Sequence, residues 1–289
     1  MATSKARRGG ERVPAAIVAT PTSAAPAPAP AATDAELALL ALYAEDAFCQ
    51  ANGRRVRTDP RLAPWNVLGT LAAVDAPLRF GKHTVGAKEC FYGWLLERGP
   101  ERVLAIRGTE GCREWLIDAI IAPRTVHPVA GKVESGFWSV YQSMRIDGGP
   151  ITSIEGPVTV VGHSLGAALA TFASLELARA GQKVRGVFVA SPHPGDRDFC
   201  KAFGAEVPDH VLYRNVDDIV PRLPFWFKYS SVPNVRMLSA KAAGTTIGGG
   251  MGGQHHVISY VALMDRKALK TFKPLPCDRK FLDCVKVPK

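Results

Sequence analysis

The chain has 289 residues, of which 47% are hydrophobic and 21% are charged, and this composition is typical of a globular protein with a sizeable core. Its formal net charge is +10, but the basic residues are spread along the chain, and their longest runs are pairs such as Arg7-Arg8. This pattern argues against a nucleic-acid-binding protein, and no segment has the length and apolar character of a membrane-spanning helix. We therefore expect neither a nucleic-acid partner nor a transmembrane segment.

The first 33 residues are rich in Ala and Pro and are predicted to form a disordered tail, because Pro ends helices and they hold little bulky apolar surface. The apolar stretch 13–19 is interrupted by Pro14 and makes a poor core for a secretory signal. The scarcity of acidic residues leaves an organellar presequence open, so extracellular and intracellular locations both stay open. Residues 34–289 are predicted to form one domain.

Strands alternate with helices along this domain. A helix is predicted over residues 34–49, with Asp34 as its cap and acidic residues in its first turn. Four short apolar runs predict buried strands at residues 102–107, 158–161, 184–190 and 210–214. Leu165, Leu169 and Phe172 recur at helical spacing, and Gly181 is a suitable C-cap. The alternation predicts an α/β fold with a mainly parallel central sheet and helices on both faces.

The segment 158–172, VTVVGHSLGAALATF, places Ser164 between two glycines at the exit of a predicted strand. One interpretation is an ordinary strand-to-helix turn, since Gly and Ser are common turn residues. The other is a nucleophile elbow, in which the serine hydroxyl is exposed above the sheet. The strand before it and the helix after it favour the elbow, which would place Ser164 where open α/β sheets bind ligands.

A nucleophilic serine needs a base, and the base needs an acid that orients it. In α/β-hydrolases these follow the serine in the order acid, then histidine. Asp217 and Asp218 stand at the end of a predicted strand, and His255 and His256 precede the apolar run 257–264. Taken alone, the aspartates could be turn residues and the histidines an exposed pair without a role.

Two further features carry no clear chemistry. The Gly-rich segment 248–253 contains G-x-G-x-x-G, but it does not join a strand to a helix in a βαβ unit, so we predict a flexible loop rather than a dinucleotide site. Six cysteines are present, and a disulfide between Cys277 and Cys284 would close a short polar loop, while other pairings stay open. No paired Cys/His spacing indicates a metal site.

Five segments together resemble the class 3 lipases of the α/β-hydrolase fold, over most of residues 35–264. They are 106–115 (IRGTEGCREW), 133–137 (VESGF) followed by Tyr141, 162–166 (GHSLG), 188–196 (FVASPHPGD) and 215–224 (NVDDIVPRLP). The sequence departs from the family pattern at Glu134, where histidine is usual, at Ala190, where glycine is usual, and at Pro194, where valine is usual. The first of these departures lies outside the catalytic triad.

The resemblance implies that Asp218 rather than Asp217 is the acid, because the family's acid directly precedes an Ile/Val-Val-Pro segment. It favours His255 as the base, since His255 to Tyr260 fits the family frame His-x-apolar-x-x-Tyr, although members with a shorter gap would favour His256. The backbone N–H of Leu165, the residue after the nucleophile, is one expected oxyanion donor. By resemblance the second is Thr109. No metal or organic cofactor is required.

By the same resemblance, the apolar segment 115–131 corresponds to a lid that opens at an oil–water interface, and the alternative is a helix packed in the core. The aromatic stretch 224–227 would line the acyl groove or anchor its loop. The implied function is a serine carboxylic-ester hydrolase, a triacylglycerol lipase that acts as a monomer on lipid esters at an interface. The alternatives are a phospholipase A1, a general esterase, or a catalytically idle binding protein with this fold.

Overall fold

The computed structural model describes residues 30–74, 79–80, 83–84, 88–109, 124–224 and 228–286. The contacts divide the chain into two units, Met1–Pro30 and Ala31–Lys289. The predicted tail, up to residue 29, lies outside the described residues, as do Cys112, residues 115–123 of the predicted lid and the aromatic residues 225–227. The disorder of the tail and the predicted lid therefore stay predictions.

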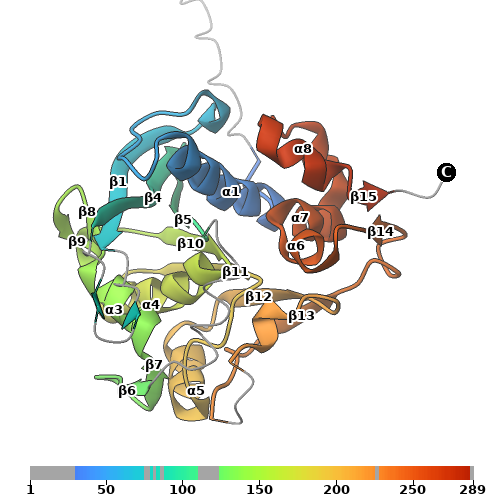
Figure 1. The fold of residues 1–289 in the computed structure, drawn as a ribbon. Helices are drawn as coiled ribbons and strands as arrows, with labels where there is room; N and C mark the ends of the chain where they lie inside the picture. The colour runs from blue at the N-terminus through green and yellow to red at the C-terminus, as the bar shows by residue number, and fades with distance from the viewer. Residues whose placement is uncertain are drawn as a thin grey trace, which may run out of the picture. The chain divides into compact units, whose positions relative to one another are not determined.

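The second unit is built around one nine-stranded sheet (Figure 1). Its strands, in spatial order, are β13 (Val235–Leu238), β12 (His210–Asn215), β11 (Val184–Val189), β10 (Val158–His163), β5 (Glu101–Ile106), β4 (Glu89–Arg98), β1 (Asn66–Val74), β8 (Arg145–Ile146) and β9 (Gly149–Pro150). The strands from β13 to β5 pair in parallel, and the pairs from β5 to β9 are antiparallel. All four predicted strands belong to the parallel part.

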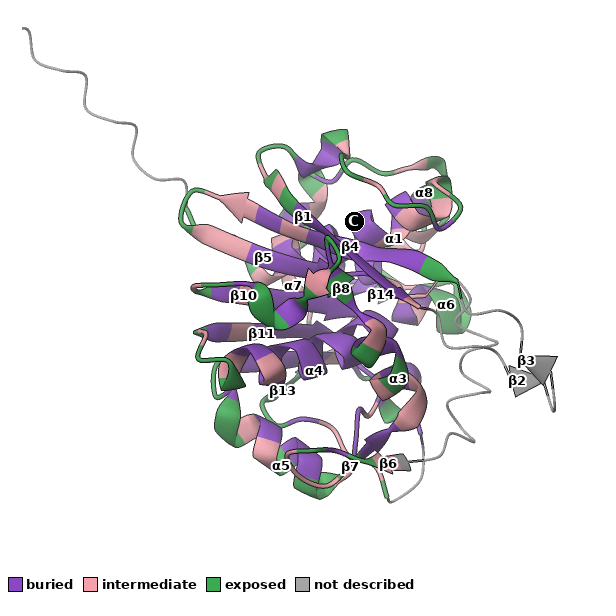
Figure 2. Cartoon of the chain, turned by 90° about the vertical axis from the view of Figure 1, so that its left-hand side faces the viewer, coloured by how far each residue is buried: buried purple, intermediate pink, exposed green. Residues whose placement is uncertain are grey.

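Helices cover both faces of this sheet, as the sequence predicted (Figure 1). One face carries α3 (Ser135–Ser143), α4 (Leu165–Arg179) and α5 (Arg197–Glu206), and the other carries α1 (Asp34–Gln50), α6 (Gly250–His255) and α7 (Val257–Asp265). A further helix, α8 (Pro276–Leu282), follows near the end of the chain. The central strands are buried on both sides (Figure 2), which explains their continuous apolar sequences.

The remaining elements are short. They are the strand pairs β2 (Arg79–Phe80) with β3 (His83–Thr84), β6 (Arg124–Val126) with β7 (Lys132–Glu134), and β14 (Thr246–Ile247) with β15 (Val285–Lys286). Four single 3₁₀ turns are η1 (Pro60–Leu62), η2 (Ile151–Ser153), η3 (Val220–Arg222) and η4 (Arg266–Lys270). Within the described ranges, no helix is long and apolar enough to cross a membrane.

The predicted helix at 34–49 forms, but its predicted cap is wrong. Thr33 is the N-cap, and it exchanges hydrogen bonds with Glu36 in a capping box. Asp34 is instead the first helical residue, and its carboxylate accepts hydrogen bonds from Arg185 at 2.5 Å and from the Tyr213 hydroxyl at 2.6 Å. Thr33 and Asp34 are both residue types that cap helices. The sequence pattern does not indicate which of them is the cap and which is the first helical residue.

The flexible loop predicted at 248–253 is wrong, because α6 begins within it at Gly250. A Cβ on Gly253 would lie 1.9 Å from the Gly248 carbonyl oxygen, and one on Gly249 would lie 2.6 Å from the Cys284 sulfur. These glycines therefore permit close backbone packing rather than flexibility. The thiols of Cys277 and Cys284 are not joined, and Cys284 donates to the Lys280 carbonyl at 3.1 Å.

Candidate active site

Ser164 occupies the sharp turn between β10 and α4. Its backbone angles are φ 55° and ψ −126°, a conformation that costs a non-glycine residue about 1–3 kcal/mol. The turn is held by the hydrogen bond from the Ser164 N–H to the Val189 carbonyl, at 2.9 Å. A Cβ on Gly162 would lie 2.3 Å from the Gly166 oxygen, and one on Gly166 would lie 2.3 Å from the Arg107 oxygen. Both flanking positions therefore require glycine.

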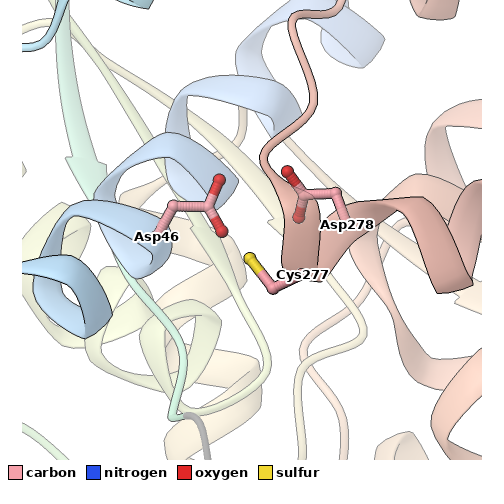
Figure 3. Close-up of side chains that lie close together, drawn as sticks. All are labelled: Asp46, Cys277 and Asp278. Carbon is pink, nitrogen blue, oxygen red and sulfur yellow. The ribbon is translucent and has the colours of Figure 1, made fainter.

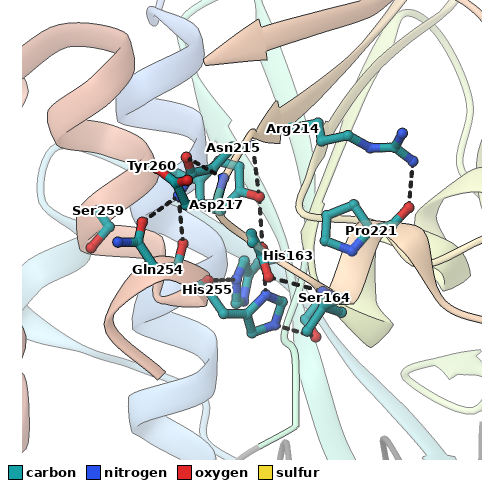
Figure 4. A network of polar contacts seen from close by, with 12 residues as sticks. His163, Ser164, Arg214, Asn215, Asp217, Pro221, Gln254, His255, Ser259 and Tyr260 are labelled. Carbon is teal, nitrogen blue, oxygen red and sulfur yellow. Dashed lines mark hydrogen bonds and ion pairs between the residues drawn. The ribbon is translucent and has the colours of Figure 1, made fainter. Parts of the chain in front are cut away.

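The side chains of Ser164, His255 and Asp218 form one hydrogen-bonded row, and Figure 4 shows Ser164 beside His255. The Ser164 Oγ lies 2.9 Å from His255 Nε2, and His255 Nδ1 lies 2.8 Å from Asp218 Oδ2. All three residues are buried, with exposed fractions of 1%, 3% and 2%. They come from the turn after β10, from the last residue of α6 and from the loop after β12. The structure thus brings together the nucleophile, base and acid that the sequence predicted.

Asp218 is fixed by two further hydrogen bonds. Its Oδ1 accepts from the Val220 N–H at 3.0 Å, and its Oδ2 also accepts from the Tyr260 hydroxyl at 2.7 Å. The same hydroxyl accepts from the Asn215 N–H at 3.0 Å. The neighbouring Asp217 is exposed, and its N–H donates to the Asn215 side chain at 3.3 Å. The carboxylate that meets the histidine is therefore that of Asp218.

His256 has a structural role rather than a place in the hydrogen-bonded row. It caps α7, where its Nδ1 accepts from the Ile258 N–H at 3.3 Å, and its ring stacks on Phe281 with the centroids 3.7 Å apart. Burial lowers the pKa of His256 to about 3, so its ring is neutral at physiological pH. The geometry therefore selects His255 between the two candidates.

Burial lowers the pKa of His255, although the Asp218 carboxylate opposes this. A neutral imidazole bonded to a carboxylate carries its proton on Nδ1 and leaves Nε2 as a proton acceptor. Nε2 is the atom that faces the Ser164 hydroxyl. The arrangement can therefore accept a proton from Ser164 across a wide pH range.

The two expected oxyanion donors flank this turn. Leu165 is the first residue of α4, so its N–H belongs to the group of helix N-terminal donors without a partner inside the helix. Thr109 follows β5 in a segment that lies against the turn, since a Cβ on Gly108 would be 3.1 Å from the His163 carbonyl oxygen. Their role as donors remains a proposal.

The family model for Lipase (class 3) matches residues 103–228, the segment that holds Ser164 and Asp218. This segment, somewhat less than half of the chain, is therefore similar to the class 3 lipases. Secreted mono- and diacylglycerol lipase A from Penicillium cyclopium is 34% identical over 136 residues, which cover 42% of this chain and 42% of that protein. Phospholipase A1-II 3 from Oryza sativa subsp. indica is 31% identical over 160 residues, or 42% of this chain and 38% of that protein. The chain thus matches about two fifths of the length of these relatives.

The fold is also that of known lipases. The crystal structure of M37 lipase superposes with a TM-score of 0.61, covering 86% of this chain and 96% of that chain at 15% identity. The predicted α/β-hydrolase fold is therefore confirmed. At this identity the likeness concerns the fold alone.

Glu134, where class 3 lipases usually have histidine, has a structural role here. It is the N-cap of α3, and its carboxylate accepts from the Gly136 N–H at 2.9 Å and the Phe137 N–H at 2.5 Å. Burial raises the pKa of Glu134. A carboxylate fits this position because it accepts two N–H groups at the positive end of a helix.

One group of described residues has side chains of metal-ligand type close together: Asp46 on α1, with Cys277 and Asp278 on α8 (Figure 3). Their ligand atoms lie within 4.8 Å of one another. Asp46 already forms an ion pair with Arg61 at 2.6 Å, and Asp278 accepts from the Leu275 N–H at 2.7 Å. A cation would have to compete with the guanidinium group, so we assign this group no role in the chemistry.

Sequence reasoning gave no role to two residues near the triad, Glu45 and His163. His163 Nε2 lies 2.8 Å from the His255 carbonyl oxygen, and Glu45 Oε2 lies 3.7 Å from His163 Nδ1. A signal for Glu45 exists in the sequence, since it interrupts a helix that is apolar on nearly all sides. A charged residue in such a helix is seldom buried without a partner.

Proposed function

We propose that the protein is a serine hydrolase that cleaves the carboxylic esters of lipids, with triacylglycerols as its substrate class. The observation that carries this proposal is the buried, hydrogen-bonded row of Ser164, His255 and Asp218 at a strained strand-to-helix turn. A protein that only binds ligands has no need for a serine held at a positive φ against a histidine. This argues against a catalytically idle fold.

The reaction begins with the Ser164 hydroxyl. Its oxygen attacks the ester carbonyl carbon while its proton moves to His255 Nε2, at 2.9 Å in the resting site. Asp218 then faces a positively charged imidazole and stabilises it. The negative charge on the former carbonyl oxygen is stabilised by the N–H groups of Leu165 and Thr109, each such donor contributing about 3–4 kcal/mol.

The second half of the reaction releases the products. The tetrahedral intermediate collapses, the bond to the alcohol breaks, and the alcohol oxygen takes the proton from His255. Water then attacks the acyl-enzyme carbonyl, giving one proton to His255, which returns it to Ser164 as the fatty acid leaves. Every proton that leaves Ser164 or water therefore passes through one ring nitrogen.

The relatives support a glycerol ester as the substrate, whereas triacylglycerol itself is the expectation from the sequence resemblance. One is named a mono- and diacylglycerol lipase and another a phospholipase A1. Phospholipase A1 activity is thus the second candidate, and both reactions cleave an acyl ester of glycerol. Ser164 is buried, with 1% of it exposed, and the resemblance to lipases with a lid predicts a catalyst that works best at a lipid surface.

The test is hydrolysis of tributyrin below and above its solubility limit, beside a soluble short-chain ester and a phospholipid carrying a labelled sn-1 acyl chain. Ser164→Ala is the control. We expect tributyrin cleavage that increases when droplets form and is lost in the control. Faster release from the phospholipid would select phospholipase A1, and equal rates on the soluble ester would select a general esterase. Absence of Ser164-dependent cleavage of any ester would refute the proposal.

A further inference from the structure

A second acid–histidine pair lies directly beneath the proposed base. His163 is the last residue of β10 and is 4% exposed, and Glu45 comes from α1 with its Oε2 buried. His163 Nδ1 and Glu45 Oε2 are 3.7 Å apart. On its other side, His163 Nε2 is 2.8 Å from the His255 carbonyl oxygen (Figure 4), and the rings of the two histidines have their centroids 4.8 Å apart. The pair therefore contacts both the backbone and the ring of the base.

The groups around His163 indicate which of its two ring nitrogens carry a hydrogen. A carbonyl oxygen can only accept, so Nε2 must carry a hydrogen. A neutral imidazole would then turn the bare Nδ1 toward a carboxylate oxygen, which places two acceptors face to face. Neither Nδ1 nor Glu45 Oε2 has another hydrogen-bond partner among the described residues. At 3.7 Å the two atoms are too far apart for a hydrogen bond, but a proton on Nδ1 would give the buried carboxylate a charged partner.

The charges near the pair indicate whether the proton resides on the His163 ring or on the Glu45 carboxylate. Burial alone raises the pKa of Glu45, but the contact with His163 and the charge of Arg107 lower it below its usual range. The charge of Glu45 in turn raises the pKa of two nearby acids, Asp46 on the same helix and Asp278 on α8. The carboxylate is thus ionised, and the proton belongs to the ring.

We infer that His163 carries a proton on both ring nitrogens, held there by the Glu45 carboxylate, and that Glu45 is a positioning residue for the base His255. The doubly protonated ring donates to the His255 carbonyl oxygen and so fixes the end of α6. Its positive charge also opposes protonation of the His255 ring beside it. This keeps the base neutral in the resting site. The link to catalysis rests on the proposed function, whereas the shared proton does not.

Glu45→Gln tests the inference, because glutamine has nearly the same shape without the charge. In protein labelled with ¹⁵N in its histidine rings, ¹H–¹⁵N correlation spectra at pH 7 report which ring nitrogens carry hydrogen, and His163→Gln identifies the His163 signals. We expect both nitrogens to be protonated in the wild type and only Nε2 in Glu45→Gln. In that variant the pKa of His255, read from the same spectra, should rise, because the loss of the His163 charge outweighs the loss of the Glu45 charge.

The labelling rate of Ser164 by a soluble fluorophosphonate gives a second readout. A higher pKa of His255 predicts that the rate falls more steeply from pH 8 to pH 5.5 in Glu45→Gln than in the wild type, with a rate within twofold of the wild type at pH 8. Asp46→Asn is the matched control, since it removes a buried carboxylate from the next position of the same helix, and it should leave the His163 spectrum unchanged.

A wild-type His163 ring with a single hydrogen overturns the shared proton. An unchanged pKa of His255 in Glu45→Gln overturns the positioning role, and so does an equal shift in Asp46→Asn. Failure of the wild type to react with fluorophosphonate, with the spectra as expected, would instead refute the proposed function and leave the histidine pair established.

Discussion

Replacing Tyr260 by phenylalanine tests whether the support of Asp218 contributes to the chemistry. The hydroxyl donates to Asp218 Oδ2 at 2.7 Å and accepts from the Asn215 N–H at 3.0 Å. Tyr260 is completely buried, and burial, with the nearby Asp218 charge, raises its pKa well above the usual value. The hydroxyl therefore stays protonated and permanently directs its hydrogen at the carboxylate.

The expected loss has two parts. A hydrogen bond to a charged group contributes about 1.5–3 kcal/mol, and a buried N–H left without a partner costs about 1–3 kcal/mol. Together they predict that Tyr260→Phe lowers the free energy of unfolding by about 3 kcal/mol, or the melting temperature by about 8 °C for a domain of this size. Because Asp218 keeps its bonds to His255 and Val220, we expect the Ser164 labelling rate to fall only about tenfold, which corresponds to 1.4 kcal/mol.

Tyr213→Phe is the matched control for this change. Its hydroxyl also donates to a carboxylate, that of Asp34 at 2.6 Å, and accepts from Arg236 at 3.3 Å, but it has no contact with Asp218. We expect a loss of about 1 kcal/mol in stability and a labelling rate within twofold of the wild type. Fluorophosphonate labelling and urea unfolding measure the two quantities. A Tyr260→Phe protein that reacts as fast as Tyr213→Phe would refute the reasoning.

Three more outcomes follow from the geometry. Asp218→Asn should lower hydrolysis of a chromogenic ester about 10³–10⁴-fold, whereas Asp217→Asn should stay within twofold; equal losses would contradict the assignment. Gly166→Ala should yield insoluble or unfolded protein by circular dichroism, since its Cβ would meet a carbonyl oxygen at 2.3 Å, and a soluble, folded variant would argue against the tight turn. Burial, followed by the Asp278 charge, raises the pKa of Asp46 to about 7. Folding therefore favours the protonated form of Asp46. The stability that this form contributes is lost as the pH rises through 7, and each unit of pKa shift corresponds to about 1.4 kcal/mol. The melting temperature should therefore fall between pH 5 and pH 8, and fall less in Asp278→Asn; an identical fall in both proteins would count against this pair.

The sequence predicts the centre of the fold well because several levels of order agree there. The runs at 158–161, 184–190 and 210–214 are apolar without alternation, as strands buried on both faces must be. The glycines around Ser164 are needed wherever a helix returns closely over its strand. Local pattern and tertiary packing therefore indicate the same structure, and the nucleophile follows from it.

Other features depend on contacts that a linear pattern does not contain. The choice between Asp217 and Asp218 is made by which carboxylate the turn directs at Tyr260 and His255. The Gly-rich segment has low helix propensity, yet α6 begins within it, where Gly249 packs closely against the Cys284 sulfur. In both cases residues distant in sequence decide the local conformation, so propensity alone gives either two answers or the wrong one.

The distribution of the site along the chain follows from the topology of the sheet. Ser164 and Asp218 lie inside the matched family segment 103–228. Each of them follows the carboxyl end of a central parallel strand. His255 and Glu45 lie outside it, on either side, and come from the layer in which α1 and α7 pack together over one face of the sheet. The proposed nucleophile and acid are thus positioned by the strands. The proposed base His255 and its positioning residue Glu45 are instead positioned by helices that come from opposite ends of the chain. Packing of α1 against α7 therefore has a direct effect on the base, and a substitution that loosens this contact should reduce reactivity before it unfolds the sheet.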